Sequence, residues 1–452
     1  MDLFGTAGIR GPVARITPEL ALSVGRAAGV DADEVVVGRD GRDTGESLAA
    51  AVEAGLTSAG ADVRRAGQLP TPALAFASQG RYGIMLTASH NPPEDNGIKL
   101  FVDGQEFDRE RERRVERRVA DDVAPTNWDE WATTETVSPL STYRGAVASY
   151  AAEHGASPEG MTVAVDCGNG MASLATPQVL RELGANVVAL NANVDGQFTA
   201  RESKPTAESL TDLREFVADG PARFGIGHDG DADRIVIVDG EGDVIHEDTI
   251  LALVAGHYVR ESAAGDPVVV TTPNASGRID QRVRAAGGRI ERVRLGALHE
   301  GIASARADGS GGTRVVFAAE PWKHIHPAFG GWIDGVASAA VFTRLVAEEG
   351  LSTLRGRVTE RPYRKKSVPC PEEKKEPAMA HLERTLPEAF PEASVDMEYG
   401  VRLEFGDGEW TLVRPSGTEP YIRVYAESDH VDDLVNAVIE RIERAIESQQ
   451  SV

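Results

Sequence analysis

One serine stands where a nucleophile could work. Ser89 lies in residues 87–92, which read Thr-Ala-Ser-His-Asn-Pro and directly follow the apolar run at residues 82–86. The run predicts a strand, and open α/β sheets place their ligands at the carboxyl ends of their strands. A serine held there can act as a nucleophile. On its own, such a segment would more often be an ordinary Ser/Asn turn, so its interpretation depends on the rest of the chain.

An acidic cluster supplies what phosphoryl chemistry at that serine would need. Residues 229–234 read Asp-Gly-Asp-Ala-Asp-Arg and lie between two short apolar runs that predict strands, residues 224–227 and 235–238. Carboxylates at alternate positions can converge on one hard cation such as Mg²⁺. An EF-hand begins with the same spacing, but Arg234 stands at its glycine position and Gly240 at its glutamate position. We therefore expect a site for one Mg²⁺, with a solvated acidic turn as the alternative, at Asp229, Asp231 and Asp233.

A third segment has the composition of a phosphate-binding loop. Residues 414–420 read Arg-Pro-Ser-Gly-Thr-Glu-Pro, and a second arginine follows in residues 421–425. Guanidinium groups bind a phosphate dianion bidentately, and loop N–H groups can complete the site. The alternative is a glycine-rich turn stabilised by its own side chains. The expected phosphate-binding residues are Arg414, Ser416, Gly417, Thr418 and Arg423.

Alternating strand and helix patterns must position these loops over the first three quarters of the chain. Residues 34–38 predict a strand and residues 47–57 a helix, and the pattern repeats at residues 162–165 and 177–183. Such alternation predicts doubly wound α/β layers. The chain ends in a helix whose apolar stripe should face a core, formed by Val431, Leu434, Val435, Val438, Ile439, Ile442 and Ile446.

The chain is strongly acidic and poor in lysine. Its 452 residues include 71 Asp and Glu against 47 Lys and Arg, a net charge of −24, and only seven are lysines. Such a surface is typical of proteins that work in molar salt, so we expect a halophilic enzyme. Nucleic acid is an unfavourable partner. Residues 109–118 alternate Arg with Glu and predict a solvated helix face with ion pairs.

Several other classes of protein are disfavoured. No charge-free apolar stretch approaches membrane length and the chain opens with no signal peptide, so we expect a cytoplasmic protein without a membrane partner. Cys167 and Cys370 form no disulfide framework or metal spacing. No lysine follows a glycine, which excludes a Walker A motif. Residues 168–170 begin like a dinucleotide-binding fingerprint, but Ser173 stands where that fingerprint requires Gly or Ala. The oligomeric state is not predicted.

Together the motifs resemble those of the α-D-phosphohexomutase superfamily, in family order over nearly the whole chain. Further similar stretches are residues 4–11, 96–99, 165–170, 195–198 and 370–375. The resemblance implies three similar doubly wound α/β domains and a smaller C-terminal α+β domain around a central cleft. The phosphoserine, metal, sugar-recognition and phosphate loops should lie, in that order, in domains spanning residues 1–140, 141–245, 246–350 and 351–452.

The resemblance also implies an enzyme, an intramolecular phosphotransferase acting on a sugar 1-phosphate or 6-phosphate. A phosphoryl group on Ser89 would pass to the sugar, giving a sugar bisphosphate that also serves as activator, and the opposite phosphate would return. Mg²⁺ would be held by the three aspartates and an oxygen on Ser89. Arg10 and Lys99 would handle the proton or stabilise charge, and His90 would orient the loop.

One loop departs from the family pattern. The sugar-recognition loop usually reads Glu-x-Ser-Gly-His, whereas residues 320–324 read Glu-Pro-Trp-Lys-His. The expected sugar-binding residues are Arg234, Glu320, Trp322, Lys323 and His324. A cation at position 323 should disfavour a protonated amino sugar, which favours glucose or mannose phosphate. Glucosamine and pentose phosphates remain as alternatives, ahead of a sugar phosphatase or a non-catalytic sensor. His326 is expected to be an ordinary packed or surface residue.

Overall fold

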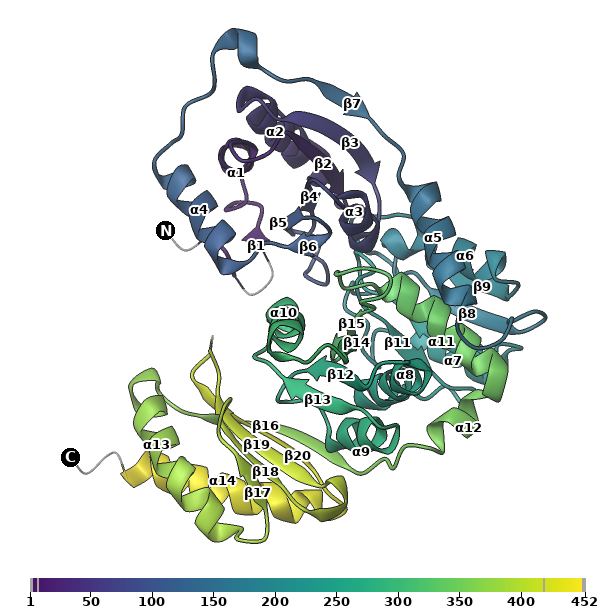
Figure 1. Cartoon of the computed structure of the whole chain (residues 1–452), viewed down its shortest axis with the longest axis vertical. Coiled ribbons are helices and arrows are strands. Elements are labelled where there is room, and N and C mark those ends of the chain that lie inside the picture. Colours follow the sequence, from purple (N-terminus) through teal and green to yellow (C-terminus); the bar gives the residue numbers. More distant parts are fainter. Residues whose placement is uncertain (1–2, 6–7, 418, 449–452) are drawn as a thin grey trace. The chain divides into compact units, whose positions relative to one another are not determined.

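The computed structural model describes residues 3–5, 8–417 and 419–448, and Figure 1 shows its helices and strands along the chain. The chain forms two compact units. The first unit comprises residues 1–247 and 322–354, and the second comprises residues 248–321 and 355–452. This division is coarser than the four expected domains, whose boundaries stay a prediction.

The first unit opens with a mixed sheet in the order β1-β5-β4-β2-β3-β7, with β6 paired to β5. β2, β3 and β4 are parallel, whereas β5 is antiparallel to β4 and β1. Residues 35–37 of β2 are all buried valines, as expected for a central strand covered on both faces. The strands are β1 (Ile9–Pro12), β2 (Glu34–Arg39), β3 (Asp62–Gln68), β4 (Tyr82–Leu86), β5 (Asp95–Val102), β6 (Gln105–Glu106) and β7 (Thr134–Thr136).

Four helices accompany this sheet: α1 (Pro18–Gly29), α2 (Gly45–Ser58), α3 (Thr71–Ala77) and α4 (Arg109–Ala120). α1 and α2 pack closely because glycines stand at their crossing: a Cβ on Gly25 would lie 2.4 Å from the Val52 carbonyl oxygen. The predicted helix at residues 47–57 is confirmed by α2. In α4 only Val115 is buried, and Arg109 and Arg114 pair with glutamates of the same helix, which confirms the solvated, ion-paired face.

A second sheet of the first unit has the order β11-β10-β8-β9. β8 is parallel to its two neighbours, and β11 is antiparallel to β10. Its strands are β8 (Thr162–Asp166), β9 (Asn186–Leu190), β10 (Phe224–Gly227) and β11 (Val236–Val238). The unit is completed by β15 (Lys323–Ile325), by short 3-10 turns at Trp128–Glu130 and Met171–Leu174, and by α5 (Leu140–Ala152), α6 (Thr176–Glu182), α7 (Thr211–Asp219), α11 (Gly335–Glu349) and α12 (Leu351–Arg355).

The second unit contains a parallel set of strands followed by an antiparallel sheet. The parallel set has the order β13-β12-β14. Its elements are α8 (Glu247–Glu261), β12 (Asp266–Thr271), α9 (Gly277–Ala285), β13 (Arg289–Arg292), α10 (Leu298–Asp308) and β14 (Thr313–Glu320). The antiparallel sheet has the order β16-β20-β19-β18-β17. Its strands are β16 (Tyr363–Pro369), β17 (Ser394–Asp396), β18 (Val401–Glu404), β19 (Trp410–Pro415) and β20 (Tyr421–Glu427), with a 3-10 turn at Gly406–Gly408.

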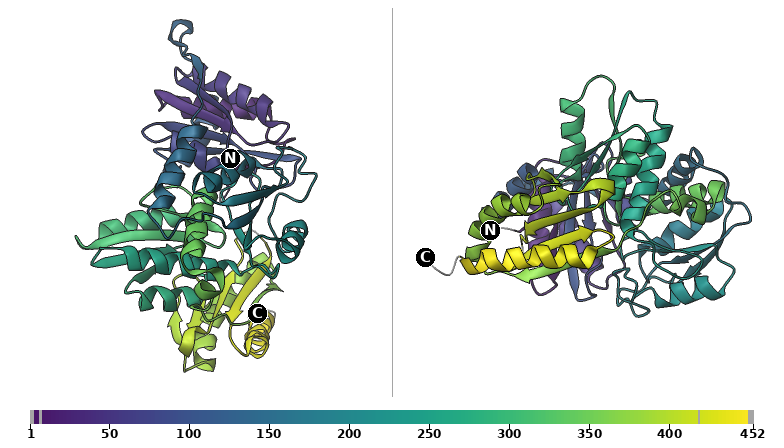
Figure 2. Two further views of the ribbon diagram at one scale, coloured as in Figure 1. Left: turned by 90° about the vertical axis from the view of Figure 1, so that its right-hand side faces the viewer. Right: turned by 90° about the horizontal axis from the view of Figure 1, so that it is seen from below.

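Two helices, α13 (Glu372–Ala389) and α14 (Val431–Ser448), pack on one face of this antiparallel sheet (Figure 2). Val435, Val438 and Ile442 of α14 are buried, and its other predicted stripe residues are buried or pack against that core. The apolar stripe predicted from the sequence is therefore confirmed. Alternation along β20 buries Ile422 and Val424 beneath the helices and leaves Arg423 on the opposite side of the strand.

Three of the sheets repeat one strand order. In β4-β2-β3, β10-β8-β9 and β14-β12-β13 the earliest strand is central, the next lies on one side and the third on the other. The connections therefore turn in opposite directions from each central strand, which is the arrangement that creates a ligand-binding crevice in open α/β sheets. The predicted α/β fold class, with three similar doubly wound parts and a smaller C-terminal α+β part, is confirmed.

Candidate active site

Ser89 follows β4 directly and is completely buried. Its φ of +53° lies in the left-handed region, which costs a residue with a side chain on the order of 1 kcal/mol. Its amide donates to Thr87 Oγ1 at 2.8 Å, and its hydroxyl donates to Asp229 Oδ2 at 2.7 Å. The unusual backbone conformation therefore accompanies a hydroxyl that is directed at the acidic loop.

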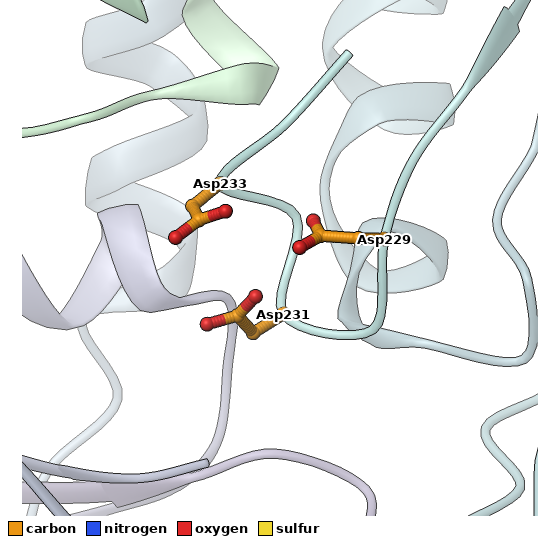
Figure 3. A group of neighbouring side chains, drawn as sticks. All are labelled: Asp229, Asp231 and Asp233. Carbon is orange, nitrogen blue, oxygen red and sulfur yellow. The ribbon is translucent and has the colours of Figure 1, made fainter. Parts of the chain in front are cut away.

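The acidic loop follows β10 and carries three buried carboxylates (Figure 3). One oxygen from each of Asp229, Asp231 and Asp233 lies within 4.8 Å of the other two. Asp231 Oδ1 and Asp233 Oδ1 are buried without a hydrogen-bond partner among the described residues. Buried carboxylate oxygens without donors are costly, so this loop fits a divalent cation.

Electrostatics within the loop also favour a bound cation. Burial, reinforced by the charges of Asp233 and Asp231, raises the pKa of Asp229 well above its ordinary value. Burial opposes ionisation of Asp231 and Asp233 as well, but Lys99 helps to lower the pKa of both. Its Nζ lies 3.3 Å from Asp231 Oδ2 and 3.1 Å from Asp233 Oδ2. A divalent ion would allow all three carboxylates to ionise together.

Four cations surround the three carboxylates. Burial would lower the pKa of Lys99, but Asp231 and Asp233 raise it above its ordinary value, so Lys99 is an ammonium group. Arg234 Nε lies 3.6 Å from the carboxylate of Asp229. The other two cations, Arg10 on β1 and Lys323 on β15, both contribute to lowering the pKa of Asp233. This excess of positive charge suits a doubly charged phosphoryl group.

His90 is a neutral imidazole in this site. Burial, with the charges of Arg234 and Arg10, lowers the pKa of His90 to about 3. Its Nδ1 lies 3.3 Å from Ser89 Oγ, a long contact that fits the predicted role of orienting the serine loop. A neutral ring can exchange hydrogen bonds with the hydroxyl without adding a fifth positive charge.

Thr71 is a site residue that the sequence analysis missed. Its hydroxyl donates to Asp231 Oδ2 at 2.6 Å, and its amide donates to the Asp231 carbonyl at 3.0 Å. Thr71 is the first residue of α3, so a helix N-terminus fixes the acidic loop from a point 160 residues away in sequence. No local pattern marks this threonine.

The expected sugar-binding residues fall into both units. In the first unit Lys323 forms a backbone bridge to Arg234, which places the two side chains next to each other. Trp322 has a φ of +69°, its carbonyl accepts from the Ile235 amide at 3.1 Å, and its indole packs partly against an apolar cluster beneath β11. In the second unit, Glu320 at the end of β14 accepts a hydrogen bond from the Gly296 amide.

Two histidines follow in the same loop. Burial lowers the pKa of His324 to about 3, and its carbonyl accepts from the Asp334 amide at 2.8 Å. His326 is buried and shares a 2.8 Å hydrogen bond with Ser338 Oγ. His326 is therefore packed in the interior, which is one of the two placements expected for it, and its lack of a role in the site stays a prediction.

The predicted phosphate loop joins β19 to β20 in the second unit. Arg414 and Arg423 stand opposite each other on these strands, and the Nε atom of each is buried without a hydrogen-bond partner in the described part of the chain. Lys375 Nζ donates to the Ser416 carbonyl at 2.8 Å and so fixes the loop from α13. Gly417 is exposed, and Thr418 lies outside the described residues. Arg414 also donates to the Pro415 carbonyl and the Tyr425 hydroxyl, and Arg423 pairs with Glu419, so a phosphate would compete with these contacts for part of each guanidinium group.

Comparison with protein families settles what kind of protein this is. The models "Phosphoglucomutase/phosphomannomutase, alpha/beta/alpha domain I", "alpha/beta/alpha domain II" and "C-terminal domain" match residues 1–125, 143–242 and 367–445. The chain belongs to the phosphoglucomutase/phosphomannomutase family. It is therefore a phosphomutase, an intramolecular phosphotransferase, and the predicted membership of the α-D-phosphohexomutase superfamily is confirmed.

Relatives within this family carry different substrate names. The "Phosphopentomutase" of Thermococcus kodakarensis is 39% identical, with 99% of this chain and 100% of the relative covered. The "Probable phosphoglucosamine mutase" of Methanopyrus kandleri is 41% identical, with 98% of each chain covered. Both names favour the predicted alternatives over the glucose or mannose phosphomutase that the sequence analysis preferred.

Solved structures of this family support the fold. A "Phosphoglucomutase/phosphomannomutase family protein" of Burkholderia thailandensis superposes with a TM-score of 0.84 at 24% identity, covering 99% of this chain and 97% of that chain. No helix within the described residues is both long enough and apolar enough to cross a membrane.

Proposed function

We propose that this phosphomutase interconverts the 1-phosphate and the 5-phosphate of a pentose. The observation that supports the proposal is the position of Lys323. It lies next to Arg234, at a place where the family pattern has a glycine. Two adjacent cations disfavour the ammonium group of glucosamine phosphate, and a relative matched over its full length is named phosphopentomutase.

We propose Ser89 as the residue that carries the phosphoryl group. The group would pass from Ser89 Oγ to the free hydroxyl of the sugar phosphate, so that the P–O bond to Ser89 breaks as one to the sugar oxygen forms, and the proton of the sugar hydroxyl would pass to Ser89 Oγ. The bisphosphate would return its other phosphate to Ser89 by the reverse exchange. Lys99, Arg10 and Arg234 would stabilise the charge that develops on the transferring group. Mg²⁺ held by the three aspartates would neutralise phosphoryl oxygens.

The remaining predicted residues would hold the substrate. Glu320, Lys323 and His324 would contact the sugar hydroxyls. The non-reacting phosphate would bind the loop formed by Arg414, Ser416, Gly417 and Arg423. The sugar bisphosphate would act as the activator that phosphorylates Ser89 in enzyme that lacks the group.

A panel of sugar 1-phosphates tests the substrate. The kcat/KM for ribose 1-phosphate should exceed the values for glucose, mannose and glucosamine 1-phosphates, and Lys323→Gly should raise the relative value for glucosamine 1-phosphate. If the parent enzyme prefers glucosamine 1-phosphate, or if Lys323→Gly leaves all ratios unchanged, the assignment of Lys323 is wrong.

Phosphoglucosamine mutase is the second candidate. The observation in its favour is the Methanopyrus kandleri relative, which is the more identical of the two relatives described above. The same panel separates the candidates, because a preference for glucosamine 1-phosphate would require the two adjacent cations to tolerate a third.

We further propose that the enzyme works at high salt. The net charge of −24 favours this assignment, since salt screens the repulsion among excess carboxylates. Unfolding temperature should rise as potassium chloride increases toward molar concentration. An unfolding temperature that does not respond to potassium chloride would contradict the proposal.

A further inference from the structure

Arg42 is a fully buried arginine in the loop that follows β2. The side chains of Arg42 and Asp40 are both 0% exposed, and Arg42 Nε lies 3.1 Å from Asp40 Oδ2. The Arg42 amide also donates to Asp40 Oδ1 at 3.0 Å. Burying a charge pair is costly unless its remaining hydrogen-bonding groups find partners, so the destinations of the other guanidinium N–H groups matter.

Those N–H groups all donate to carbonyl oxygens of the serine loop. Nη2 donates to the Ser89 carbonyl at 3.1 Å and to the Asn91 carbonyl at 2.7 Å. Nη1 donates to the Asp95 carbonyl at 2.8 Å and to the Pro92 carbonyl. A guanidinium carries five N–H donors in a fixed planar fork, and here one serves Asp40 and four serve the backbone between Ser89 and Asp95.

Residues 195–198, one of the stretches that resemble the family, support Arg42 from the other side. The Phe198 ring centre lies 5.0 Å from the Arg42 guanidinium carbon. Gly196 packs so tightly that a Cβ there would lie 2.5 Å from the Gly41 carbonyl oxygen, and the side-chain Nε2 of Gln197 donates to the Asp43 carboxylate. This stretch therefore contacts both chain neighbours of Arg42, Gly41 through its backbone and Asp43 through its side chain.

Two further residues hold the same loop. Ser203 Oγ donates to the Asn91 carbonyl at 2.9 Å. A Cβ on Gly230, within the acidic loop, would lie 2.7 Å from the Ser89 carbonyl oxygen. The Ser89 carbonyl therefore lies between the guanidinium of Arg42 and the backbone of the acidic loop. No side chain fits at position 230 without displacing this carbonyl.

We infer that Arg42 is a positioning residue that holds Ser89 in its left-handed conformation and thereby directs Oγ, and any phosphoryl group on it, toward the acceptor. Arg42 acts on the backbone carbonyl and does not touch Oγ. A lysine could not replace it, because three donors on a flexible stem cannot serve four carbonyls in one plane. The inference rests on the proposed role of Ser89 as phosphoryl carrier.

The variant Arg42→Lys tests the inference, because it keeps the charge and removes the fork. A displacement of the reacting group by about 1 Å costs on the order of 100-fold in rate, so kcat should fall by that order while KM stays within about threefold. Arg42→Ala should regain part of its kcat in added guanidinium chloride at non-denaturing concentration, but not in methylammonium chloride. The control is Arg65→Lys on β3, which also keeps the charge and removes the fork. The Arg65 side chain is 52% exposed and its guanidinium binds Glu53 instead of the serine loop, so this variant should keep its kcat.

Several outcomes would overturn the inference. An Arg42→Lys enzyme with normal kcat would do so, as would a kcat that methylammonium restores equally well. If Arg42→Lys does not fold, Phe198→Leu removes the ring beside the guanidinium, and an unchanged kcat in that variant would contradict the account. Mass spectrometry of the parent enzyme after incubation with a sugar bisphosphate separates the two proposals, because a parent that gains no phosphate on Ser89 refutes the phosphoryl-carrier role rather than the role of Arg42.

Discussion

The serine and acidic loops of the first unit differ from the phosphate loop of the second in how far their residues are exposed to solvent. Ser89, Lys99 and Asp229 are almost entirely buried, and their contacts fix one geometry. In the phosphate loop Gly417 is exposed, and 22% of the Arg423 side chain is exposed. The difference indicates a division of labour, because chemistry requires preorganised charge whereas a binding loop needs accessible donors. Changes in the first region should lower kcat, and changes in the second should raise KM.

The largest effect should come from Ser89→Ala. Removing the hydroxyl that would carry the phosphoryl group should lower kcat by at least about 1000-fold, with little change in the unfolding temperature because the left-handed loop is held by its backbone. Steady-state kinetics and thermal unfolding measure the two quantities. Retention of full activity would show that Ser89 does not carry the phosphoryl group, and the contrast between a catalytic region and a binding loop would then lose its basis.

Asp231→Asn should have the next largest effect. The substitution keeps an acceptor for Thr71 but removes one of three charges that would hold Mg²⁺, so the metal concentration for half-maximal activity should rise by at least about tenfold. Titration of Mg²⁺ after treatment with a chelator measures this shift. Full activity of the parent enzyme in excess chelator would refute the metal assignment of the loop.

Arg423→Lys tests the other side of the comparison. Lysine keeps the charge but cannot bind phosphate bidentately, so KM should rise by about tenfold while kcat changes little. The matched control is Arg364→Lys on the neighbouring strand β16, whose exposed pair with Asp432 should not affect KM. A fall in kcat at constant KM would break the division between the two regions.

The smallest effect concerns pH and stability. Burial lowers the pKa of His326 well below 6.5 and that of His324 to about 3. The unfolded chain therefore binds more protons below about pH 6.5, and stability should fall as pH drops, by about 1.4 kcal/mol per pH unit for each histidine. His326→Gln should flatten this dependence in urea unfolding between pH 7 and pH 5. An unchanged slope would show that His326 does not contribute.

The sequence predicted those parts of the site that depend on neighbouring residues. Ser89 and the three aspartates each follow an apolar strand, so their types and spacing were enough to predict a cation site and to locate it at strand ends. The terminal helix α14 was predicted for the same reason, because its stripe repeats at helical spacing.

The remaining parts depend on contacts between distant residues. Thr71 reaches Asp231 across 160 residues, and Arg42 reaches Ser89 across 47, so no local pattern reveals either contact. The local sequence does not predict the left-handed backbone conformation of Trp322 either. It also does not predict that the indole packs partly on an apolar cluster formed by distant residues. The sugar preference predicted from that loop lost support for this reason and because the relatives are named for other substrates.

The most direct measurement of the central claim follows one labelled phosphoryl group. The enzyme would be incubated with a sugar bisphosphate carrying radioactive phosphate, digested and mapped, and a second sample would be chased with unlabelled sugar phosphate before digestion. The account predicts label on Ser89 that moves to the sugar during the chase, with little free phosphate. Label on another residue, label that stays on Ser89 during the chase, or release of most of it as inorganic phosphate would contradict the account.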